Sequence, residues 1–133
     1  MGPQCTETTA LFLHRDHDLE RRILQVFLRV IETVLRQYSL GAPADARFGG
    51  VSFVHRFGSA LNAHTHYHCC FLDGVVGRGD EFCTDDTPGR DPIRWFEATA
   101  LTPAAITAAQ KQIQHRVLRL FIKQGLLDSL AAE

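Results

Sequence analysis

The sequence predicts an α+β fold, in which an antiparallel sheet is flanked by two long helices. Two segments, near 16–40 and 102–124, carry apolar side chains at three- and four-residue steps, which places them on one face of a helix. Residues 51–56 are rich in β-branched and aromatic side chains, as strands are. Residues 63–73 follow after a short connection, so the two strands should pair antiparallel.

The first helix should begin at Asp16 or Asp18, because either side chain can cap its free N–H groups. Glu20 adds a negative charge near the first turn, which the helix dipole favours. Gly41 followed by Pro43 should end the helix. Its predicted apolar face consists of Leu19, Ile23, Phe27, Val30, Ile31, Val34 and Tyr38.

The second half of the chain predicts a loop, a strand and a helix. Residues 74–91 contain several glycines and acidic side chains, which is typical of a turn-rich loop. Residues 93–98 follow as a further strand, and we expect 63–73 to lie between 50–56 and 93–98 in the sheet. Thr102 and Pro103 are a capping residue and a first-turn proline, so they should open the last helix, which Gly125 terminates.

Three histidines alternate along the second strand, at His64, His66 and His68. Side chains two residues apart on a strand point to the same face. Two imidazoles in this arrangement can reach one cation. His55, on the preceding strand, faces either the same site or the core, depending on the register between the strands.

The residues around these histidines resemble a known family. Arg56 to Asn62 spell RFGSALN, His66-Tyr67-His68 is a His-hydrophobic-His triplet, and Leu72-Asp73-Gly74 follows. This block is similar to the core of the two-tyrosine rolling-circle transposases of bacterial insertion sequences, which are HUH single-strand endonucleases. A weaker similarity runs from about Leu11 to Leu127.

The resemblance implies a function in DNA transposition. Mg²⁺ or Mn²⁺ would be bound by His66 and His68 with one more polar ligand, and His64 and His55 are possible accessory residues. The cation would polarise a scissile phosphate of single-stranded DNA, and a tyrosine would attack it to form a phosphotyrosine intermediate.

The nucleophile is not evident in this chain, whose only tyrosines are Tyr38 and Tyr67. Tyr67 should face away from its two flanking histidines, and Tyr38 lies on the apolar face of the first helix. The family's paired tyrosines lie on a later helix. We therefore interpret residues 1–133 as one domain, a partial catalytic core with an irregular start at 1–10 and no catalytic residue of its own; the tyrosine region is expected beyond residue 133.

Charge and hydropathy suggest the partners. The formal net charge is −1, but basic side chains cluster locally, and Arg56, Arg116, Arg119 and Lys123 are candidates to contact DNA phosphates. No apolar run is long enough to span a membrane and no signal peptide is evident, so a cytoplasmic protein is expected. The expected partner is single-stranded DNA, with no membrane and no small-molecule substrate.

Two alternative functions are compatible with the sequence. The first is a non-catalytic DNA-binding remnant of a transposase, which would use the basic helices. The second is a zinc-dependent hydrolase or lyase with a strand-borne His-x-His site, although RFGSALN would then have no explanation.

Overall fold

The computed structural model describes residues 15–78, 93–99 and 101–127, and this part of the chain has the predicted α+β fold. The irregular start predicted at 1–10 and residues 79–91 of the predicted acidic loop lie outside the described residues. The elements, in chain order, are α2 (His17–Tyr38), β1 (Gly50–Phe57), β2 (Ala63–Phe71), β3 (Gly74–Arg78), β4 (Ile93–Glu97) and α3 (Pro103–Lys123).

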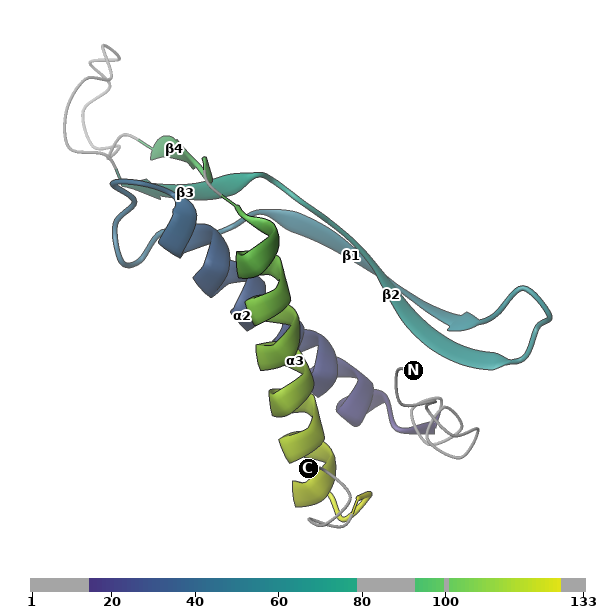
Figure 1. Cartoon of the computed structure of the whole chain (residues 1–133). Coiled ribbons are helices and arrows are strands. Elements are labelled where there is room, and N and C mark those ends of the chain that lie inside the picture. Colours follow the sequence, from purple (N-terminus) through teal and green to yellow (C-terminus); the bar gives the residue numbers. More distant parts are fainter. Residues whose placement is uncertain (1–14, 79–92, 100, 128–133) are drawn as a thin grey trace.

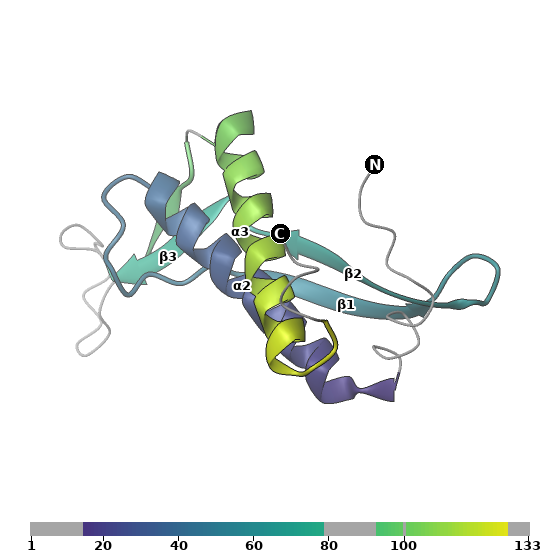
Figure 2. The same ribbon diagram turned by 60° about the horizontal axis from the view of Figure 1, so that its bottom comes forward.

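The β1–β2 hairpin is a long antiparallel pair, and both helices lie on the same side of it (Figure 1). Helix α2 is next to the hairpin, and α3 crosses α2 on the side away from the hairpin (Figure 2). The opposite face of the hairpin is not covered by any element that the structure describes. The hairpin therefore has an inner face towards α2 and an outer face towards solvent.

The ends of the two helices confirm the sequence predictions. The Asp16 carboxylate accepts hydrogen bonds from the backbone N–H groups of Asp18 and Leu19, at 3.0 and 2.9 Å. The Thr102 hydroxyl accepts a hydrogen bond from the N–H of Ala105 at 3.2 Å, and Gly125 adopts a left-handed φ of 68° just after α3. These signals are local, which is why the sequence alone reveals them.

The predicted strand order is wrong. β2 pairs with β1 alone among the described strands, while β4 pairs with β3, a strand that lies in the segment predicted to be a loop. Gly74 separates β2 from β3 with a φ of 157°, and a Cβ atom there would collide with the carbonyl oxygen of Phe96 on β4. Val75 follows and is fully buried, so the chain beyond Gly74 starts a second sheet instead of a loop.

The hydrophobic core lies where the second sheet meets α2. Its buried members are Leu35, Ala46, Val75 and Ala98. The hairpin joins this core through Phe71, whose ring centroid lies 5.9 Å from that of Phe27 and 5.5 Å from that of Phe48. An apolar cavity of about 470 Å³ lies between α2, the end of β2 and α3. Because this packing involves only the base of the hairpin, the rest of the hairpin requires other contacts to hold it on α2.

Candidate functional site

The outer face of the hairpin brings three histidines together. In the β1–β2 register, His55 lies opposite His66, and Phe53 lies opposite His68. Residues opposite each other in a sheet share a face, so His55, His66 and His68 form one cluster, which we call the histidine triad. The ligand nitrogens of the triad all lie within 4.8 Å of one another. The ring centroids are 4.6 to 5.3 Å apart.

The hydrogen bonding of His66 orients its ring. Its Nδ1 lies 3.0 Å from the backbone carbonyl oxygen of His64, and because a carbonyl only accepts, Nδ1 is the protonated nitrogen in this contact. The other ring nitrogen, Nε2, is then the one with a lone pair. A backbone carbonyl that fixes the tautomer in this way is common behind metal-binding histidines.

His64 lies beside the triad but is not one of its members. Its ring centroid is 5.2 Å from that of His66, and its side chain is exposed. The cluster of ligand atoms close enough for one cation contains His55 in its place. Of the two accessory candidates, the structure therefore brings His55, and not His64, together with His66 and His68.

The geometry of the triad fits a divalent transition metal. Metal–imidazole bonds of about 2.0–2.1 Å bring ligand nitrogens to about 3–3.5 Å from one another. The separations in the triad are at most 4.8 Å, so side-chain rotations can bring the nitrogens to the distances that a cation requires. His55 and His68 are exposed, which leaves them room for such a rotation and leaves the site open to a ligand.

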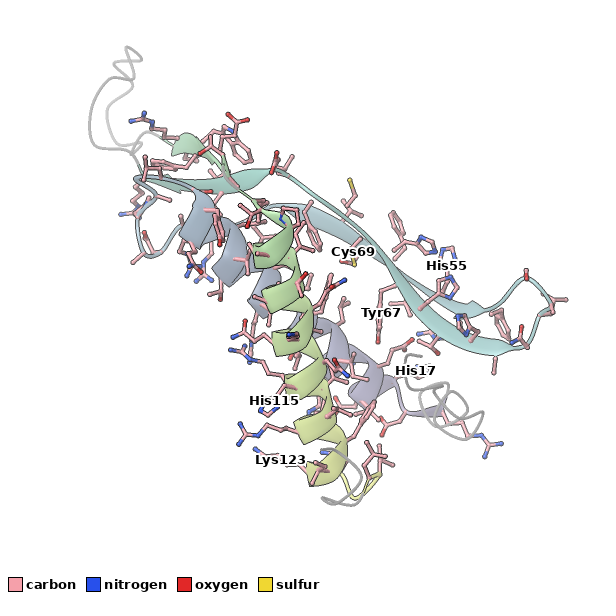
Figure 3. The ribbon with its side chains drawn as sticks, in the orientation of Figure 1. His17, His55, Tyr67, Cys69, His115 and Lys123 are labelled. Atoms are coloured by element: carbon pink, nitrogen blue, oxygen red, sulfur yellow. The ribbon has the colours of Figure 1, made fainter. Side chains whose placement is uncertain are left out.

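The inner face of the hairpin is fixed to α2 directly behind the triad. The Tyr67 hydroxyl donates a hydrogen bond to the backbone carbonyl of Glu20 at 2.8 Å. The Arg56 guanidinium lies 3.0 Å from the Glu20 carboxylate, whose side chain is only 5% exposed, whereas that of Arg56 is 41% exposed. His17 Nδ1 lies 3.3 Å from the same carboxylate. Figure 3 shows Tyr67 pointing towards α2 and His55 pointing away from it.

This buried contact was not evident from the sequence. Glu20 was expected only to add a favourable negative charge near the first turn of the helix, but it is also buried and paired with a residue 36 positions away. Arg56, predicted to contact DNA, makes this ion pair. An acid in the first turn of a helix and an arginine at the end of a strand are both common, so no local pattern indicates that they meet.

Neither tyrosine is arranged to act as a nucleophile at the triad. Burial, followed by the negative charge of Glu20, raises the pKa of Tyr67 to about 12, and its hydroxyl lies on the inner face. Tyr38 packs against the core cluster at the far end of α2. Both placements agree with the sequence predictions that Tyr67 faces away from its flanking histidines and that Tyr38 lies on the apolar face of the first helix.

The predicted basic residues of α3 lie on a different surface. Arg116, Arg119 and Lys123 are exposed and share one face of α3, because their positions fall within about a quarter turn. Lys123 and His115, which lie about two turns apart on α3, both point away from the hairpin (Figure 3). The structure therefore does not bring these cations to the histidine triad.

Comparison with known proteins identifies the family. Residues 49–133, which include the hairpin, the second sheet and α3, match the family described as "Putative transposase", and the chain belongs to this family. A function related to transposition follows, with DNA as the partner. No curated protein and no solved structure matches the chain. Neither described helix is long and apolar enough to cross a membrane.

Proposed function

We propose that this chain is the part of a rolling-circle, HUH-type transposase that binds a divalent cation and single-stranded DNA. The observation that carries the proposal is the convergence of three imidazoles from two strands on an open face, in a chain of a transposase family. His66 and His68 supply two ligands, and His55 is the third ligand that the resemblance requires.

The role of the triad is to hold a cation where a phosphate can approach it from solvent. A bound Mg²⁺ or Mn²⁺ supplies Lewis-acid polarisation of a phosphate oxygen. His66 contributes Nε2, because the His64 carbonyl holds the proton on Nδ1. The inner-face contacts of Tyr67 and Arg56 hold the strands that carry the three imidazoles against α2.

Strand cleavage requires a nucleophile besides the residues described. Tyr67 holds its proton too tightly and faces the wrong way, and Tyr38 is packed in the core. The attacking tyrosine in this proposal therefore comes from outside residues 1–133, either from a longer form of the chain or from another molecule. Arg56, Arg116, Arg119 and Lys123 remain proposed DNA contacts, of which the α3 residues bind phosphates away from the triad.

Isothermal titration with Mn²⁺ tests the metal site. The double variant His66→Ala/His68→Ala and the single variant His55→Ala should each lose measurable binding, and Mn²⁺ should bind the wild type more tightly than Mg²⁺. His64→Ala is the matched control, because it removes an adjacent imidazole but keeps the backbone carbonyl that orients His66. If the double variant gives the wild-type isotherm, the proposed site is wrong.

The placement of the tyrosines favours one second candidate, a non-catalytic DNA-binding remnant of a transposase. Both candidates predict binding to single-stranded oligonucleotides, which fluorescence anisotropy would measure. The two candidates differ in whether the DNA is cut. If the chain is part of a transposase, a version extended downstream by a helix that bears two tyrosines should nick single-stranded DNA in the presence of the metal. Binding without nicking under these conditions supports the remnant.

A further inference from the structure

The outer face of the hairpin also carries an exposed aromatic ring beside the triad. Phe53 is 59% exposed and is the direct cross-strand partner of His68. Opposite side chains in an antiparallel pair have Cβ atoms about 4.5–5.5 Å apart, so the phenyl ring adjoins the imidazole. Both helices lie on the other side of the hairpin (Figure 1), and no described element covers the outer face, which Phe53 shares with His55 and His68.

The surroundings of Phe53 do not suggest a role in folding. The inward-facing side chains of β1 alternate with Phe53, and one of them, Arg56, contacts α2 through its ion pair with Glu20. The large aromatic side chain that contributes to the core at this hairpin is Phe71, at the base. A phenyl ring that remains more than half exposed gains little from folding. Its position opposite His68 makes it available to a ligand of the triad.

We propose that Phe53 is a stacking platform for one unpaired base of the nucleic-acid strand whose phosphate lies at the triad. Aromatic side chains bind single strands by stacking, which tolerates any base because every base has a π-face. Residues two apart along β1, such as Phe53 and His55, are about 6.6 Å apart, comparable to one nucleotide of an extended strand. The triad therefore takes the phosphate and the ring takes an adjacent base. This inference rests on the proposed function.

A second copy of the chain is a less suitable occupant of this surface. The large exposed apolar side chains of β1 are Val51, Phe53 and Phe57. A stable interface buries roughly 800 Å² on each partner, far more than three half-exposed side chains provide. One ring beside a phosphate-binding cluster matches the size and chemistry of a nucleotide.

Anisotropy with two oligonucleotides of equal length tests the proposal, in the presence of Mn²⁺. One is an oligothymidylate, and the other has the same sugar–phosphate charge with abasic sites throughout. The wild type should prefer the oligothymidylate, and Phe53→Ala should weaken its binding roughly 5- to 150-fold, the loss expected for one base–aromatic stack. Binding of the abasic strand and of Mn²⁺ should be unchanged, because neither involves a base.

Three variants separate stacking from other effects. Phe53→Tyr should bind like the wild type, whereas Phe53→Leu should bind weakly, because it keeps the apolar bulk but loses the aromatic face. Leu40→Ala is the matched control: Leu40 is 91% exposed, apolar and outside the hairpin, and its loss should change nothing. Circular dichroism confirms that each variant compared is folded.

The remaining outcomes overturn the proposal in distinguishable ways. If the wild type binds the oligothymidylate and Phe53→Leu binds equally well, stacking is wrong but the proposed function stands. If the wild type binds no oligonucleotide at low salt, both fail. If sedimentation shows a wild-type dimer that Phe53→Ala dissociates, this surface is an interface between copies.

Discussion

Replacing Arg56 by alanine should destabilise the fold before any DNA is added. The change leaves the Glu20 carboxylate, which is 5% exposed, without its nearest cationic partner, 3.0 Å away. Removing one partner of a fully buried ion pair costs about 3–5 kcal/mol. Because the Arg56 side chain is 41% exposed and His17 remains near the carboxylate, we expect a smaller loss in the free energy of unfolding, about 2–3 kcal/mol. For a domain of this size that lowers the midpoint of thermal unfolding by roughly 10 °C.

Urea denaturation followed by circular dichroism measures this loss. Arg21→Ala is the matched control, because Arg21 and Asp18 are 3.9 Å apart with both side chains 69% exposed, and such surface pairs contribute about 0–1 kcal/mol. In a double-mutant cycle, the loss in the free energy of unfolding caused by Arg56→Ala should be smaller by at least about 1 kcal/mol in a Glu20→Gln background, a coupling of the size measured for other residues in contact. The reason is that no unpaired charge then remains. If Arg56→Ala costs no more than Arg21→Ala, or the cycle shows no coupling, the buried pair does not hold the hairpin.

Three further predictions follow from the described contacts. Tyr67→Phe should lower the free energy of unfolding by about 1 kcal/mol at neutral pH, because the hydrogen bond to the Glu20 carbonyl is lost. Since the folded state raises the pKa of Tyr67 from 10.0 to about 12, its stabilisation is complete below pH 10 and is lost as the pH rises through 12. Unfolding curves should therefore show the advantage of the wild type over this variant shrinking across that window; a constant difference contradicts it. Gly74→Ala should cost about 1–3 kcal/mol, because the added Cβ collides with a β4 carbonyl, and a denaturation midpoint equal to wild type would exclude that clash. Alanine at Arg116, Arg119 or Lys123 should in each case reduce the slope of log affinity against log salt for single-stranded DNA by about 0.7. Anisotropy at several salt concentrations measures this slope. Unchanged slopes would show that α3 does not contact the DNA.

The sequence predicted those parts of the fold that depend on neighbours along the chain. The cap at Asp16, the opening of α3 at Thr102 and the pairing of two strands across a short connection are set within a few residues, and the structure confirms them. The resemblance around RFGSALN likewise agreed with the transposase family that the comparison identified.

The parts that could not be predicted depend on contacts between distant segments. The glycines of 74–78 are typical of a loop, so the sequence did not predict a strand there. The strand forms because Val75 packs into the core with Leu35, Ala46 and Ala98. The sequence did not determine on which face of the hairpin His55 lies. The register of the two strands places it opposite His66. The contact between Glu20 and Arg56 joins a helix start to a strand end, and neither residue type is unusual at its position.

The one-sided covering of the hairpin has a stereochemical consequence for any phosphate held at the triad. In an in-line displacement the attacking and leaving oxygens lie on opposite sides of the phosphorus atom. Because β1, β2 and α2 occupy the space behind the imidazoles, neither oxygen can lie there (Figure 3). In the proposed function, the line from nucleophile to leaving group would then run roughly parallel to the plane of the two strands. A tyrosine would enter from one edge of the hairpin, and the severed strand would leave across the opposite edge.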